Sequence, residues 1–290
     1  MESSATHCRN CQSPLDGQYC ASCGQREGRG DLHFADAATE VLGDVFTWDS
    51  RIWRTLFSIL FRPGFLSAEF NAGRRMRYMP PFRLYIVVSF LMFLVLSLEA
   101  SDSVIISTES ADNPPAAVAL DSTTESKADP EPDGFTIKLS ENGPPWVQTL
   151  EKRIEANARR VREDPSDYLE TLAEYLPQIM FVMLPLFALL LKLIYFFSPF
   201  HYLQHLVFGL HYHTFVYLLY LISAGLERLS AHVDGLFALL LIIYLPLALR
   251  RCYFSSWPAA IGKSLLLLLS YGVALLLGLV TVAVAVLAII

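Results

Sequence analysis

Four cysteines near the start of the chain form the pattern with the clearest chemistry. They occur as two Cys-x-x-Cys pairs separated by eight residues, at Cys8, Cys11, Cys20 and Cys23. Four thiolates with no further ligand make the closed tetrahedral donor set in which proteins hold structural zinc. The first 30 residues lack the apolar stretch of a signal peptide, which favours a reducing compartment and metal over disulfides. We therefore predict a zinc ribbon with one structural Zn²⁺ and no catalysis at the ion.

Four histidines form a second candidate site, either for a metal or for proton transfer. They are His201, His205, His211 and His213, in or beside a hydrophobic stretch. On one helix His201 and His205 share a face, whereas His211 and His213 point about 200° apart, so one helix cannot direct all four rings at one ion. The alternative is that each ring only hydrogen-bonds to a carbonyl, a tyrosine or a lipid headgroup. The sequence leaves both interpretations open.

A basic cluster forms the third candidate, at Arg74, Arg75 and Arg77 beside Tyr78. These residues can contact anionic lipid headgroups, or they can serve only to set membrane orientation. Arg83, at the start of the following apolar stretch, is expected to extend its side chain back to the headgroups.

The composition indicates which solvent surrounds these sites. Hydrophobic residues make up 53% of the chain and charged residues only 17%, which is too apolar for an ordinary soluble domain and points to the lipid bilayer. The net charge of −6 argues against a nucleic-acid partner, because such a partner requires clustered Lys and Arg. We find no Gly-rich phosphate loop, nucleophile elbow or HExxH pattern, so the sequence favours no familiar enzyme.

The order of polar and apolar stretches predicts an all-α membrane protein with about five transmembrane helices. The first predicted span is 82–98, and 176–290 holds four more, at about 176–197, 206–226, 233–249 and 265–290. An amphipathic region at 31–81 can lie on the headgroup layer or against the membrane bundle, or can be a packed soluble helix. The remaining segments are the ribbon (1–30), an acidic, disordered extracytoplasmic linker of unknown role (99–145) and a charged helix (146–175).

Arginines flanking the first span predict the orientation. Arg74, Arg75 and Arg77 precede it, and basic residues near membrane helices favour the cytosol. The N-terminus is then cytosolic, and an odd number of spans places the C-terminus outside the cytosol.

Three segments occur in a recognisable order: CRNCQSPLDGQYCASCGQ, TLFSILFRPGFLSAEFNAGRRMRYMPPFRLY and HLVFGLHYHTF. This order resembles a bacterial family of membrane proteins of unknown function, in which a zinc ribbon precedes an RPG...G-basic-basic-x-x-Tyr-x-x-Pro stretch and several membrane helices. The matching residues are Arg62, Pro63, Gly64, Gly73, Arg74, Arg75, Tyr78 and Pro81. The resemblance implies the bacterial cytoplasmic (inner) membrane and brings no established activity.

These observations favour a non-enzymatic transport, channel or assembly role, with the zinc ribbon docking a cytosolic protein partner. One alternative is a membrane enzyme acting on a lipid or lipid-linked substrate, with His201, His205 and the arginine cluster at the cytosolic face. Another is a metal or redox sensor, which would require labile cysteine thiols. The sequence identifies neither the substrate nor the oligomeric state.

Overall fold

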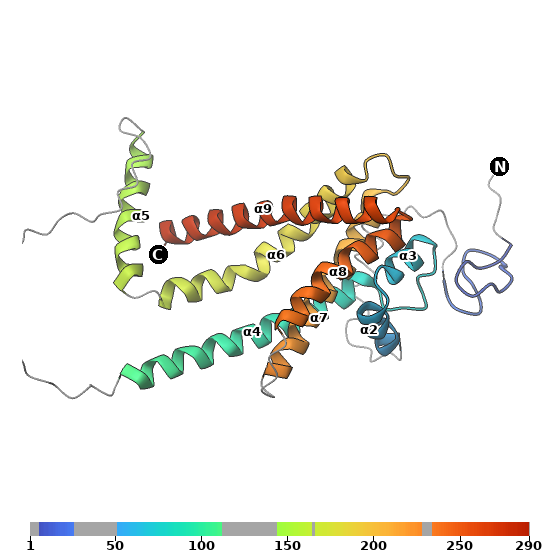
Figure 1. Cartoon of the computed structure of the whole chain (residues 1–290), viewed down its shortest axis with the longest axis horizontal. Helices are drawn as coiled ribbons and strands as arrows, with labels where there is room; N and C mark the ends of the chain where they lie inside the picture. The colour runs from blue at the N-terminus through green and yellow to red at the C-terminus, as the bar shows by residue number, and fades with distance from the viewer. Residues whose placement is uncertain (1–5, 26–50, 112–143, 164–165, 228–233, 290) are drawn as a thin grey trace, which may run out of the picture. The chain divides into compact units, whose positions relative to one another are not determined.

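The computed structural model describes residues 6–25, 51–111, 144–163, 166–227 and 234–289, and these residues are almost entirely helical (Figure 1). Over these ranges no strand forms, and the one isolated β-bridge joins His7 to Pro14. The predicted all-α class is therefore confirmed. The described helices are α2 (Arg51–Phe61), α3 (Phe65–Asn71), α4 (Pro81–Ala111), α5 (Pro145–Glu163), α6 (Ser166–Ile194), α7 (Tyr202–Glu227), α8 (Asp234–Tyr253) and α9 (Trp257–Ile289).

Five of these helices are long and apolar enough to cross a membrane, as predicted. The apolar stretches are Pro81–Glu99, Tyr168–Ile194, Tyr202–Glu227, Gly235–Tyr253 and Trp257–Ile289. In the most apolar window of α9 only 6% of the residues are buried within the protein. So much exposed apolar surface would be unfavourable in water and is favourable in hydrocarbon.

Two helix ends differ from the prediction. α4 continues to Ala111, so the segment from Glu99 to Ala111, expected to be disordered linker, is helical. No glycine or proline occurs between Pro81 and Pro114, so no residue in this stretch strongly disfavours the helix. α9 begins at Trp257, before the expected apolar start at Leu265. The backbone carbonyl of Ser256 accepts the first helical hydrogen bond, from the amide of Ala260, at 2.9 Å. The rest of the predicted linker, 112–143, lies outside the described residues.

The chain divides into two compact units, each described by itself. Unit 1 comprises the described residues of 1–95 and 180–275, and unit 2 those of 96–179 and 276–290. In unit 2 the side-chain amide of Asn157 donates to the backbone carbonyl of Leu287 at 2.8 Å. The hydroxyl of Tyr168 donates to the backbone carbonyl of Ala283 at 3.2 Å. In unit 1 the largest fully buried side chains include Phe187, Phe208, Leu191, Leu245 and Leu249.

Within unit 1 the short helices α2 and α3 pack against the apolar helices α7 and α8 (Figure 1). The turn between α2 and α3 contains Gly64, whose φ of 70° is in the left-handed region. A Cβ at this position would lie 2.8 Å from Cα of Ala248 in α8, so only glycine permits this approach. Nearby, the Tyr244 hydroxyl of α8 donates to the carbonyl of Ile59 in α2 at 2.8 Å. The close contact between this turn and α8 therefore explains the glycine of the Arg62-Pro63-Gly64 sequence.

The expected amphipathic region is described only from Arg51 onward, and residues 31–50 lie outside the described part of the chain. α2 buries Thr55, Ser58 and Ile59. Its opposite face exposes an aromatic row of Trp53, Phe57 and Phe61 at helical spacing. The helix therefore packs against the helices proposed to span the membrane, with an apolar face left uncovered by described residues.

Candidate metal centre and the histidine and arginine sites

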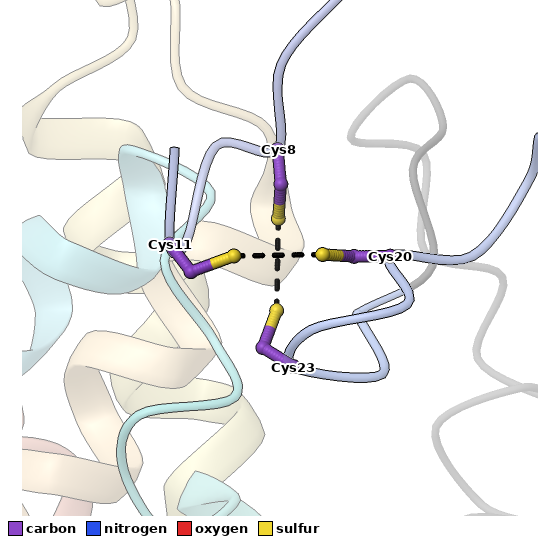
Figure 2. A group of neighbouring side chains, drawn as sticks. All are labelled: Cys8, Cys11, Cys20 and Cys23. Carbon is purple, nitrogen blue, oxygen red and sulfur yellow. Dashed lines mark hydrogen bonds between the residues drawn. The ribbon is translucent and has the colours of Figure 1, made fainter. Parts of the chain in front are cut away.

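The four predicted cysteine ligands converge on one point (Figure 2). All four sulfurs lie within 4.8 Å of one another. The Sγ atoms of Cys8 and Cys23 are 3.6 Å apart and those of Cys11 and Cys20 are 3.4 Å apart, and all four thiols are free. A tetrahedral ion with metal–sulfur bonds of about 2.3 Å requires sulfurs about 3.8 Å apart. The four cysteines can therefore bind one metal ion.

Each pair of cysteines lies in a turn with the same backbone hydrogen bonds. The amide of Cys8 donates to the carbonyl of Ser13 at 2.9 Å, and the amide of Gln12 donates back to Cys8 at 2.9 Å. The second turn has the same two hydrogen bonds twelve residues later. The amide of Cys20 donates to the carbonyl of Gln25 at 2.9 Å, and the amide of Gly24 donates to the carbonyl of Cys20 at 2.8 Å. The turns thereby place the sulfurs as two equivalent pairs.

The surroundings of Cys8 and Cys11 shift the pKa values of their thiols in opposite directions. The Ser13 hydroxyl lies 3.4 Å from the sulfur of Cys11, and hydrogen bonding to Ser13 lowers the pKa of Cys11 to about 6. Desolvation raises the pKa of Cys8 to about 11. Hydrogen bonding therefore favours the thiolate of Cys11, whereas burial disfavours the thiolate of Cys8.

The metal-binding module is anchored to the arginine-containing loop in the same unit. The side chain of Gln25, 8% exposed, donates to the carbonyl of Gly73 at 2.8 Å and accepts from the amide of Arg75 at 3.4 Å. Gly73 has a φ of 81°, and a Cβ there would lie 3.1 Å from Cδ of Arg9. Gln25 was not singled out from the sequence, because its partners are 48 and 50 residues away.

The histidines do not gather into one site. Nδ1 of His205 lies 2.7 Å from the Tyr253 hydroxyl, and Nδ1 of His211 lies 2.9 Å from the Ser67 hydroxyl. His213 contacts two groups, the carbonyl of Gly209 at 2.8 Å and the Tyr271 hydroxyl at 2.9 Å. Since a carbonyl only accepts, Nδ1 of a neutral His213 carries the proton and Nε2 accepts from the tyrosine. Among the described residues, only the four cysteines form a group able to hold a metal ion.

His201 and His205, expected to share one face, have different environments. His201 precedes the first residue of α7 and is exposed, and its amide donates to the side chain of Gln204 at 2.8 Å. His205 is completely buried and stacks on Tyr253, with ring centroids 5.4 Å apart. The expectation assumed one continuous helix, but His201 caps the helix and does not belong to it.

The arginine cluster is engaged in protein contacts to different degrees. Arg74 forms an ion pair with Glu69, donating from Nε to one carboxylate oxygen and from Nη2 to the other, and this contact raises the pKa of Arg74. The Arg75 guanidinium lies 4.6 Å from the ring centre of Phe70. Arg77 is exposed, and Tyr78 packs edge-on against Phe65. Arg77 is therefore the most accessible of the three arginines.

Arg83 departs from its expected place. Its side chain was expected to extend to the headgroups, but the residue is only 7% exposed within unit 1. The hydrophobic pattern of the segment could not show this, because burial depends on the helices packed around it.

Residues 49–93 match the model of a family described as a protein of unknown function (DUF3667). The matched residues include the turn at Gly64 and the loop from Gly73 to Tyr78. A family of unknown function agrees with the resemblance drawn from the sequence, although the match covers a minor part of the chain. No curated protein and no solved structure matches this chain.

Proposed function

We propose that this protein is a non-enzymatic membrane assembly protein, in which a zinc-stabilised N-terminal module binds a cytosolic protein partner. The supporting observation is the way in which the module is held. Gln25 anchors one side of it to Gly73, while Tyr19 is 61% exposed on its surface. A small rigid module with an exposed aromatic side chain has the features of a recognition surface.

Zinc is the metal that best fits the four thiolates. Soft sulfur ligands in a tetrahedral arrangement favour zinc, and a site with four protein ligands leaves no position for a substrate. The ion therefore has a structural role, supplying folding energy that so short a segment cannot obtain from an apolar core.

A cysteine substitution tests this assignment. Purified wild-type protein should contain one zinc ion per chain by elemental analysis, and Cys8→Ser and Cys23→Ser should lose it because a closed site needs all its ligands. His7→Ala is the matched control, since His7 is adjacent and exposed but is not required as a ligand. Wild-type protein without zinc would exclude the assignment.

The interior of unit 1 favours assembly over transport or a channel. Phe215 stacks on Tyr244 with ring centroids 3.5 Å apart, and Phe187 stacks on Tyr212 at 5.5 Å. The buried histidines of α7 contact hydroxyls of α3, α8 and α9. Such interlocking contacts support a packed scaffold. A lipid enzyme using His201 and His205 has less support, because one ring is exposed and the other is buried against Tyr253.

We further propose a location in the bacterial cytoplasmic membrane, with the N-terminus in the cytosol and the C-terminus outside it. Arg250 and Arg251 at the end of α8 and Lys263 near the start of α9 support this orientation, because basic residues flanking spans favour the cytosol. Arg77 and its neighbours are proposed contacts for anionic lipids, and no nucleic-acid partner is proposed.

Crosslinking in intact cells tests the docking role. A photo-crosslinking amino acid in place of Tyr19 should give one discrete protein adduct. The adduct should disappear when Cys20→Ser is added, since the module loses zinc, and persist with His7→Ala. If wild-type protein gives no adduct, and the purified protein in liposomes conducts ions above protein-free liposomes, a channel role replaces the proposal.

A further inference from the structure

A cavity beside the turn between α8 and α9 is lined by residues that belong to none of the predicted cysteine, histidine and arginine sites. It has a volume of about 550 Å³ and is lined by Pro63, Leu247, Arg250, Arg251, Phe254 and Ser255. All six residues belong to unit 1. Two guanidinium groups, a hydroxyl and apolar side chains therefore border one space, which suits a ligand with both an anionic and an apolar part.

The two arginines are positioned by aromatic rings. The guanidinium of Arg250 lies 4.4 Å from the ring centre of Trp257, and that of Arg251 lies 4.9 Å from the ring centre of Phe65. Stacking on a ring orients a guanidinium and leaves its edge donors available. Across the described part of the chain neither arginine has a carboxylate within ion-pair distance, since the ion pair found there joins Arg74 to Glu69. Both positive charges can therefore accept an external anion.

The apolar side of the cavity continues along α8. Leu236, Leu239 and Ile243 are exposed at 55%, 51% and 45%. At a spacing of three or four residues, they lie on the same helical face as the cavity residues Leu247 and Arg250. A hydrocarbon chain lying along this face would contact apolar side chains over its whole length, up to the point where it reaches the two arginines. This continuity favours a lipid over a soluble anion.

We propose that the cavity binds an anionic phospholipid, with the headgroup phosphate between Arg250 and Arg251 and an acyl chain along the face of α8 that includes Leu239 and Ile243. A guanidinium donates two parallel hydrogen bonds to a phosphate, so two arginines can hold several of its oxygens. The Ser255 hydroxyl, which lies 3.1 Å from that of Tyr195, borders the same space and can contact the headgroup. The site is independent of the proposed docking role of the zinc module.

Native mass spectrometry of the delipidated full-length protein in detergent tests the proposal. Phosphatidylglycerol should be retained as one molecule per chain, about tenfold more tightly than zwitterionic phosphatidylcholine. The double variant Arg250→Gln/Arg251→Gln should lose this tightly retained molecule, whereas Arg77→Gln, at the other proposed headgroup contact, should keep it. Arg153→Gln, which removes an exposed charge from α5 in unit 2, should keep it.

A second variant separates loss of the site from loss of the fold. Leu247→Trp fills the cavity but keeps both arginines, and it should weaken phosphatidylglycerol binding as the double variant does. Zinc content and a monodisperse elution profile, unchanged in each variant, verify folding. The proposal is overturned if the folded cavity variants still retain one phosphatidylglycerol molecule per chain as tightly as the wild-type protein does. It is also overturned if excess glycerol 3-phosphate or inorganic phosphate displaces the lipid, because the site would then recognise a soluble anion.

Discussion

At the scale of single residues, Gln12 occupies a backbone position better suited to glycine. Its φ is 65°, and Gly24, which holds the equivalent place in the second turn, has a φ of 72°. The left-handed region costs a residue with a side chain about 1 kcal/mol, a cost that glycine avoids. The two turns therefore have the same geometry but different amounts of backbone strain.

Gln12→Gly should remove this strain. Because metal binding and folding of the module are coupled, we expect zinc affinity to rise about fivefold, measured by competition with a chelator. Gln12→Val is the opposing variant and should weaken zinc binding, since a β-branched residue fits the left-handed region poorly. Weaker zinc binding by Gln12→Gly would show that the Gln12 side chain matters more than its backbone conformation.

Two tyrosine hydroxyls form hydrogen bonds with buried histidines. Tyr271→Phe removes the partner of His213 Nε2, and Tyr253→Phe removes the partner of His205 Nδ1. Each change should lower the free energy of unfolding by about 1 kcal/mol, with hydrogen bonds inside membrane proteins near the lower end of the usual range. Tyr175→Phe, at an exposed position, is the control. Denaturation in detergent measures the difference, and equal stability of all three variants would contradict the pairing.

At the scale of secondary-structure elements, the turn between α2 and α3 determines how these helices contact α8. Gly64→Ala places a methyl group against the backbone of Ala248 at a left-handed φ. We expect a loss of at least about 2 kcal/mol in unfolding free energy, or failure to fold, because backbone atoms cannot move aside as a flexible side chain can. Gly272→Ala in α9 is the control, since a Cβ there meets nothing within 4 Å, and it should be neutral or stabilising. Thermal stability in detergent distinguishes the two variants.

At the scale of the whole molecule, five spans require opposite locations for the N-terminus and the first long connection. A reporter that is active only in the cytosol should be active when fused at residue 5. A reporter that is active only outside the cytosol should be active when fused at residue 120. A fusion after residue 290 should report the same side as residue 120. Reporters placing residues 5 and 120 on one side would remove the first span and contradict the topology.

The sequence alone determined the features that depend on local spacing and composition. The Cys-x-x-Cys pairs predicted a four-thiol site because two residues between cysteines bring both sulfurs near one ion, and Figure 2 shows those sulfurs converging. The apolar stretches predicted five spans because burial in hydrocarbon depends on composition over about 20 residues.

Only the tertiary structure decided which distant residues meet. The partners of His205, His211 and His213 are up to 144 residues away, and the contact between Gly64 and Ala248 joins the turn between α2 and α3 to α8. Local periodicity contains no information about such pairs, which depend on how helices pack. For the same reason Arg83 is buried, and the cavity at Arg250 and Arg251 combines α8 with the distant turn at Pro63.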